Sequence, residues 1–162
     1  MRYELFTALT VFGLLGCGSE ATKPEAPKPE PGVPIAVERI ASATLSPLDT
    51  PTYRVILDPE SWAAAWSEFV AGHWPPAPPV PVVDFESRVV ILVASGALPT
   101  QLLAFRVNEV RLLDAVLSVT ILEEWPAPQC GSLPVITRPV DIVSVPRLAT
   151  QAQFISTRTS RC

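Results

Sequence analysis

The clearest regular pattern in this chain is a set of aromatic residues at helical spacing. Trp62, Trp66 and Phe69 stand at positions i, i+4 and i+7, which places them on one face of a helix. Asp58, just before this segment, is suited to cap the first turn. The pattern predicts one amphipathic helix over residues 59–71, with its aromatic face packed on a sheet.

Most of the remaining pattern predicts β-strands. The β-branched run Arg88–Ala94 is typical of a strand that is covered on both faces. Residues 103–108 and 116–122 alternate between apolar and polar side chains and predict a long hairpin. Further strands are predicted at residues 35–40, 53–57, 140–145 and 151–157. About seven strands and one packed helix predict an α+β fold built on a mostly antiparallel β-sheet.

The first seventeen residues carry the marks of an export signal. Arg2 precedes an apolar stretch over residues 5–15, which is too short to span a bilayer of about 30 Å. The stretch ends in Leu-Leu-Gly-Cys, a motif that resembles the lipobox of bacterial lipoproteins. The resemblance implies that residues 1–16 are a signal peptide and that Cys17 becomes the lipidated N-terminus. The alternative is an ordinary signal peptide with an incidental cysteine.

A proline-rich segment continues from Cys17. Over residues 17–34 proline alternates with lysine and glutamate, which predicts a solvated, semi-rigid tether with a reach on the order of 50 Å. The folded part is then expected to be a single domain over residues 35–162. Together, motif and tether predict a lipid-anchored, extracytoplasmic protein of the bacterial cell envelope. Because Gly18 rather than an aspartate follows the cysteine, the expected place in a Gram-negative cell is the outer membrane.

Charge and motif content argue against several functional classes. Twelve Lys and Arg residues against sixteen Asp and Glu residues give a net charge of −4, which argues against binding to nucleic acid or to anionic lipid. A single histidine excludes a site with several histidine ligands. The sequence contains no motif for a nucleophilic serine, a phosphate-binding loop or a metal-ligand cluster. We therefore expect no catalytic residue, no cofactor and no metal.

The three cysteines fit an oxidising compartment. If Cys17 is lipidated, Cys130 and Cys162 remain, and an even pair in an exported domain predicts a disulfide. In the chain-entropy account, closing a loop of roughly 33 residues contributes about 3–4 kcal/mol. The alternative is that Cys130 is a nucleophile partnered by His73.

The order of features along the chain is itself informative. The order begins with two tryptophans on a short helix, Trp62 and Trp66, which a proline-rich segment follows. It continues with Val83–Phe85, the buried strand Val89–Val93 and Gly96. It ends with Pro139–Val140 and Val143–Arg147. Over roughly residues 53–157 this order resembles the C-terminal domain of the protease-complex subunit PrcB family. The family consists largely of small bacterial envelope proteins, and its namesake associates with and stabilises a surface protease complex. The resemblance implies no catalytic residue, and Thr100–Leu103 stands where the family has a Gly-Gly-Tyr stretch.

Two tryptophan–proline loops are the candidates for contact with a partner. Trp74 and Trp125 are each followed by proline, and rigid aromatic side chains of this kind are enriched in binding hot spots. The alternative is that each indole folds back onto the core as a lid.

These observations predict a non-catalytic module that binds or stabilises an envelope protein, as an accessory subunit of a surface protease complex. The alternative function is that of an extracytoplasmic hydrolase or small-ligand-binding protein. Its acidic cleft would be formed by Asp84, Glu86 and Glu123, because paired carboxylates can serve in hydrolysis or in cation binding.

Overall fold

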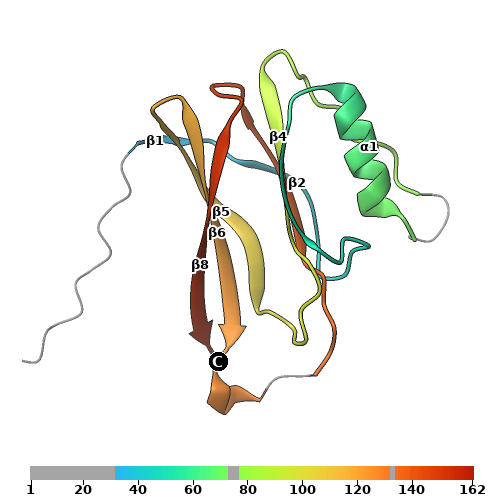
Figure 1. Ribbon diagram of the computed structural model, residues 1–162, viewed down its shortest axis with the longest axis vertical. Coiled ribbons are helices and arrows are strands. Elements are labelled where there is room, and N and C mark those ends of the chain that lie inside the picture. Colours follow the sequence, from blue (N-terminus) through green and yellow to red (C-terminus); the bar gives the residue numbers. More distant parts are fainter. Residues whose placement is uncertain (1–31, 73–76, 132–133) are drawn as a thin grey trace, which may run out of the picture. The chain divides into compact units, whose positions relative to one another are not determined.

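Eight strands, one α-helix and one 3-10 turn make up the part of the chain that the structure describes (Figure 1). This computed structural model describes residues 32–72, 77–131 and 134–162. In chain order the elements are β1 (Val33–Ile35), β2 (Glu38–Ala43), β3 (Pro51–Ile56), α1 (Pro59–Val70), β4 (Arg88–Ser95), β5 (Ala104–Leu113), β6 (Val116–Pro126), η1 (Pro128–Cys130), β7 (Val140–Pro146) and β8 (Ala152–Arg161).

The strands form two four-stranded sheets, whereas the sequence predicted one sheet of about seven strands. The outer sheet has the strand order β1-β5-β6-β8, and the inner sheet has the order β2-β7-β4-β3. Within these sheets every neighbouring pair is antiparallel except β6 and β8, which run parallel. Mostly antiparallel strands with one helix are consistent with the predicted α+β class, but the strands are divided between two layers.

The inner sheet is the middle of three layers (Figure 1). Its face toward α1 carries Val90 and Leu92, and its opposite face carries Val89, Ile91 and Val93, which pack against the outer sheet. All five side chains are buried. The prediction that this apolar run is covered on both faces is confirmed, because successive side chains of a strand point to opposite faces.

α1 begins and ends at local sequence signals. The Asp58 carboxylate accepts hydrogen bonds from the backbone N–H and the hydroxyl of Ser61, both at 2.8 Å, which satisfies a free donor of the first turn. Pro59 stands in that turn, where its missing N–H costs no hydrogen bond. The helix ends at Val70, and Gly72 follows with a φ of +79°. The predicted helix is thus confirmed, one residue shorter at its C-terminal end.

The aromatic face of α1 belongs to the core, as its spacing predicted. Trp62 and Trp66 are buried against the inner sheet. The indole N–H of Trp62 donates to the carbonyl of Pro81 at 2.8 Å, and that of Trp66 donates to the carbonyl of Pro78 at 3.0 Å. These bonds satisfy both buried indole donors and fasten the proline-rich segment to the helix.

The first described strand begins inside the predicted tether. Val33–Ile35 pairs antiparallel with Val110–Leu112 of β5, so regular structure begins two residues before the boundary predicted at Ile35. Pro34 is tolerated because β1 is an edge strand. The predicted signal peptide, and the tether as far as residue 31, lie outside the described residues.

Candidate functional site

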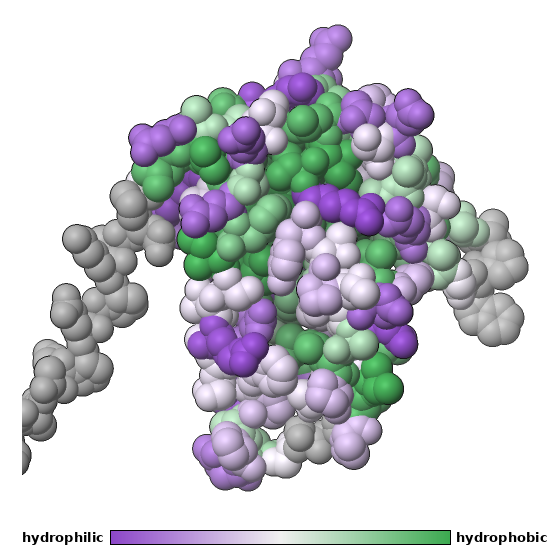
Figure 2. Space-filling view, viewed as in Figure 1, coloured by the Kyte–Doolittle hydropathy of each residue, from purple (hydrophilic) through white to green (hydrophobic). Residues whose placement is uncertain are grey.

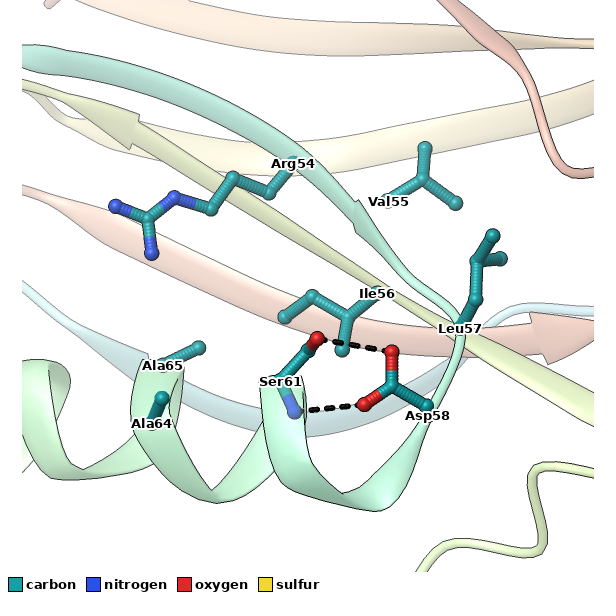
Figure 3. Close-up of a pocket in the computed structure, with 8 residues that line it drawn as sticks. All are labelled: Arg54, Val55, Ile56, Leu57, Asp58, Ser61, Ala64 and Ala65. Carbon is teal, nitrogen blue, oxygen red and sulfur yellow. Dashed lines mark hydrogen bonds between the residues drawn. The ribbon is translucent and has the colours of Figure 1, made fainter.

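A groove of about 510 Å³ lies between β3 and α1. Its lining comes from the end of β3 and from the first two turns of the helix: Arg54, Val55, Ile56, Leu57, Asp58, Ser61, Ala64 and Ala65 (Figure 3). β3 is an edge strand of the inner sheet, because β4 is its one neighbour in that sheet. The groove therefore runs along an open strand edge, and its volume lies in the range of ligand pockets.

Small side chains keep this groove open. Arg54 and Ile56 point from β3 toward the helix, and Ile56 is buried in the core beneath it. On the helix the groove is lined by Ser61, Ala64 and Ala65, none of which is long enough to bridge the space to the strand. The larger residues of α1 lie on the face that packs into the core, so the groove falls where the aromatic face gives way to short side chains.

Arg54 supplies the positive charge of the groove. Its Nη1 donates to the Glu68 carboxylate at 2.8 Å, and the two side chains are 42% and 47% exposed. A guanidinium has five N–H donors, so one such bond leaves capacity for a second acceptor. By contrast, both carboxylate oxygens of Asp58 are held by Ser61. The backbone hydrogen bond from Ser61 lowers the pKa of Asp58 below its usual value, since it stabilises the charged form.

An apolar edge strip, defined here as Tyr53, Val55, Leu57 and Phe154, is formed by the opposite face of β3 with the residue after it and one residue of β8. Val55 and Leu57 of this strip also border the groove. Val55, Leu57 and Phe154 are partly buried against the core between the two sheets, and Tyr53 is exposed. The rings of Tyr53 in β3 and Phe154 in β8 have their centroids 5.4 Å apart, so the edge strands of the two sheets contact each other through these side chains. Apolar surface gathers between the sheets in the upper centre of Figure 2.

β3 lacks the β-bulge that interrupts the other edge strand of the inner sheet. Its register with β4 is continuous over Pro51–Ile56, whereas β2, at the other edge of the inner sheet, is bulged between Arg39 and Ala41. The charged residue of β3 is Arg54, and its proline stands at the first position. Because β2 also carries charged residues, Glu38 and Arg39, the difference between the two edges is the bulge, and the continuous register makes β3 the more open of the two.

Trp125, predicted as a partner contact, lies at the end of β6 and away from this groove. Its side chain is half-buried, with the guanidinium of Arg158 at 4.6 Å from the ring centroid. Its indole N–H donates to the Glu123 carboxylate at 3.3 Å, and Arg158 also pairs with Glu123. Trp125 is thus part of a surface cluster with two charged neighbours. The other predicted contact, Trp74, lies outside the described residues, as does His73.

The acidic residues of the alternative function are divided between two places: Asp84 and Glu86 lie together just before β4, and Glu123 lies in β6 of the outer sheet. Asp84 stands in the turn before β4, where its carboxylate accepts from the backbone N–H of Glu86 at 3.0 Å and from the hydroxyl of Ser87 at 2.6 Å. These bonds, chiefly that from Ser87, lower the pKa of Asp84. Asp84 therefore shapes a turn of the inner sheet, whereas Glu123 lies in the outer sheet and pairs with Arg158.

The two cysteines outside the predicted anchor lie at disulfide distance. The Cα atoms of Cys130 and Cys162 are 5.5 Å apart, within the usual range for a disulfide. A bond there would tie η1 to the end of β8. The predicted lipidation site, Cys17, lies outside the described residues.

Residues 32–72, 77–131 and 134–162 contain neither a metal-ligand cluster nor a membrane-spanning helix. Within these ranges no three His, Cys, Asp or Glu residues are grouped so that they could hold a metal ion. The same ranges contain no helix whose length and apolar character would let it cross a membrane.

Comparison with known proteins gives no relatives: no family model matches the chain, and no curated protein or solved structure matches it significantly.

The groove was not predicted from the sequence, although part of its signal is present there. Alternation in residues 53–57 indicates a strand with Arg54 and Ile56 on one face, and the short residues Ala64 and Ala65 stand between the two helix tryptophans. What the pattern cannot indicate is that this strand is an edge strand. That depends on which strands pair, and pairing is not encoded in the alternation of a single segment.

Proposed function

We propose that this protein is a lipid-anchored, extracytoplasmic module that binds and stabilises a protein of the bacterial cell envelope, without catalysing a reaction. The observation that carries the proposal is the open edge of β3, flanked by the groove on one face and by the apolar edge strip on the other. The unpaired edge of a strand offers backbone N–H donors and carbonyl acceptors to another polypeptide. The proposed role as an accessory subunit of a surface protease complex rests on the resemblance to the PrcB family.

The proposed anchor and tether fit a binding role. With Cys17 lipidated, a proline-rich spacer reaching on the order of 50 Å would let the folded domain meet a neighbour at the membrane surface. The acidic-cleft alternative has no comparable support, because Asp84 shapes a turn and Glu123 pairs with Arg158 in the other sheet.

The proposal is tested by purifying the tagged full chain from detergent-solubilised envelope of its own cells. Wild-type protein should carry a metabolic fatty-acid label and bring down one partner in a fixed ratio, whereas Cys17→Ala should lose both the label and the membrane association. A Cys17→Ala chain that keeps label and membrane would contradict the anchor. The binding role would fail if the purified chain turned over a substrate and Asp84→Asn or Glu123→Gln abolished that turnover without unfolding it.

The same purification tests the two tryptophans that the sequence predicted as partner contacts. Trp125 was expected in a proline-rich loop, whereas it lies in β6, paired with Ser160 of β8. If Trp74 and Trp125 are exposed anchors, replacing both by alanine should reduce partner recovery with little change in thermal stability. Since Trp125 already contacts Arg158 and Glu123, we expect a modest loss of stability from that site. A decrease of several kcal/mol in the free energy of unfolding, as for a buried Trp→Ala change, would show that the indoles cover the core. The two tryptophans would then be excluded as partner contacts.

A further inference from the structure

The backbone of β3 is paired on one side only. Its six residues bond to β4 in continuous antiparallel register, and the described residues place no strand along its other side. An extended segment laid there would become a fifth strand of the inner sheet. Such addition draws its affinity from main-chain hydrogen bonds and its specificity from the pockets that receive alternate side chains.

The two faces of the β3 edge differ in the side chains that they would accept. On the helix side, a guest residue would enter the groove above Ile56, beside the short side chains of Ala64 and Ala65. On the other side, its neighbours would meet Tyr53 and Val55 of the apolar edge strip. Because side chains alternate along a strand, one guest segment would fill both faces at once.

The groove is lined by one positive side chain, Arg54, and one negative side chain, Asp58, whose two carboxylate oxygens already accept from Ser61. Arg54 is therefore the charge with donors left for a guest segment. Arg54 faces the groove, and its partner Glu68 forms an exposed ion pair of the kind that contributes little. A guest carboxylate at the position opposite Arg54 would accept from the remaining guanidinium donors, and opposite charges across two strands are stabilising. The segment favoured by this edge is apolar at alternate positions and acidic opposite Arg54.

The edge strands of a second copy are poor sources of that carboxylate. β3 itself (PTYRVI) and β8 (AQFISTRTSR) contain arginine and no acidic residue. Pairing β3 with β3 in register would place the two Arg54 side chains opposite each other, and like charges at such positions are destabilising. The other edge strands are β1, which has three residues and no acidic one, and β2. The acidic residue of β2 is Glu38, which pairs with Arg88 at 3.0 Å, and the strand is bulged just after it, between Arg39 and Ala41.

We propose that β3 and the adjoining groove receive an extended, acid-containing segment of a different protein, which adds to the inner sheet as its fifth strand. This inference rests on the proposed binding function and specifies its site and the chemistry of the partner segment.

The first test uses a displayed library of random ten-residue peptides, selected on the full chain in detergent micelles. Selected peptides should alternate apolar residues with an aspartate or glutamate. Ala64→Phe, which fills the groove, should weaken their binding by about tenfold or more. Ala63→Phe is the matched control, because it adds the same bulk to an exposed position of α1 that does not line the groove, and it should bind as wild type does.

Charge is tested with the same peptides. Arg54→Glu should weaken binding of an acidic peptide by about tenfold, and exchanging the peptide's acid for lysine should restore it. The proposal is overturned if selection yields no binding peptide, if Ala64→Phe and Ala63→Phe bind equally, or if the charge exchange restores nothing. It is also overturned if sedimentation shows a dimer that Ala64→Phe dissociates, since the occupant would then be a second copy.

A parallel purification from envelope separates this inference from the function on which it rests. Partner recovery should fall with Ala64→Phe and stay at the wild-type level with Ala63→Phe, while both variants keep the wild-type melting temperature. Unchanged recovery with Ala64→Phe would overturn the site and leave the binding function standing. Absence of any stoichiometric partner with wild-type protein would overturn the function itself.

Discussion

Arg39 and Asp141 form a charge pair whose carboxylate is fully buried and which joins the two sheets. Nε of Arg39 donates to Oδ1 of Asp141 at 2.7 Å, and Nη2 donates to Oδ2 at 3.1 Å. The same Oδ2 accepts from the backbone N–H of Val107 at 2.7 Å. Since Asp141 lies in β7 and Val107 in β5, one carboxylate bridges the inner and outer sheets. Its hydrogen bond raises the pKa of the Arg39 guanidinium above its usual value.

Two β-bulges coincide with this pair. β2 shifts register between Arg39 and Ala41, and β5 shifts register between Val107 and Glu109. A bulge bends its strand and redirects the neighbouring groups. In both strands the residue at the bulge donates a hydrogen bond to Asp141, so both bulges bring donors to the same buried carboxylate.

We predict unequal costs for breaking this pair from its two sides. The Arg39 side chain is 43% exposed and can return to water, whereas the Asp141 side chain is 0% exposed. Arg39→Met, which leaves a buried carboxylate with one backbone donor, should lower the free energy of unfolding by about 3 kcal/mol. Asp141→Asn, which keeps an acceptor for Val107, should cost about 1–2 kcal/mol. Urea denaturation measures both.

A matched control for this prediction is the exposed pair of Arg54 with Glu68. Arg54→Met removes the same kind of side chain from an ion pair in which both partners are accessible, and it should change stability by less than about 1 kcal/mol. Equal losses for Arg39→Met and Arg54→Met, or a larger loss for Asp141→Asn than for Arg39→Met, would contradict the account of Asp141 as the desolvated partner.

The helix could be predicted from the sequence because all of its signals are local. The cap at Asp58, the proline after it and the spacing of Trp62 and Trp66 act within a dozen residues of chain. The double burial of β4 was predictable for the same reason, since a continuous β-branched run indicates cover on both faces.

The division into two sheets could not be predicted from these patterns. Alternation indicates which face of a strand is buried, and it does not identify the neighbouring strand. After β7 of the inner sheet, the chain crosses to the outer sheet, where residues 152–161 pair in parallel with β6. This pairing depends on the whole fold and not on the local sequence. The groove also depends on how the strands pair, because this pairing places β3 at an edge of the inner sheet. The role of Asp141 could not be predicted either, since a single acidic residue in an apolar strand does not indicate that Arg39 and Val107 donate hydrogen bonds to it.

The link between Cys130 and Cys162 leads to a prediction about thiols and stability. Their positions, with Cα atoms 5.5 Å apart, suit a disulfide. Thiol titration of the unfolded chain, purified from its own cells without reductant, should find neither Cys130 nor Cys162 free until a reductant is added. Reduction should lower the free energy of unfolding by about 3 kcal/mol, because it releases a loop of some thirty residues in the unfolded chain. A titration that finds two free thiols in the exported protein would contradict the pairing.

The cap of α1 predicts a dependence of stability on pH. The pKa of Asp58 is lowered in the folded chain by its bonds to Ser61, so its contribution is fully present above the unfolded pKa of about 4 and is lost as the pH falls through the lower, folded value. Asp58→Ala should therefore reduce the melting temperature at pH 7, and the difference from wild type should narrow toward pH 2.

Asp58→Asn is the control for this titration. Asparagine offers a capping oxygen and does not ionise, so its advantage over Asp58→Ala should change little with pH. Melting curves of the three proteins at pH 7, 4 and 2 make the comparison. A gap between wild type and Asp58→Ala that is as wide at pH 2 as at pH 7 would show that ionisation of Asp58 does not support the helix.

The backbone of Gly96 lies close to the residues that lead into β3, the strand of the proposed binding edge. It has a φ of +73°, and a Cβ atom built on it would lie 2.8 Å from the backbone N of Pro51 and 2.9 Å from the carbonyl O of Asp49. Gly131 also has a positive φ, of +59°, but no described atom lies within 4 Å of its Cβ position. Both positions share the cost of a left-handed conformation, and the crowding is specific to Gly96.

Gly96→Ala should therefore destabilise the protein by about 3 kcal/mol, against about 1 kcal/mol for Gly131→Ala. Because the crowded atoms belong to the residues that enter β3, the substitution must displace the start of that strand. We expect faster amide hydrogen exchange in residues 51–56 of Gly96→Ala and weaker binding of the selected peptides, with neither change in Gly131→Ala. Equal stability losses with unchanged exchange in β3 would show that the turn before β3 adjusts freely, and that Gly96 does not position the proposed binding edge.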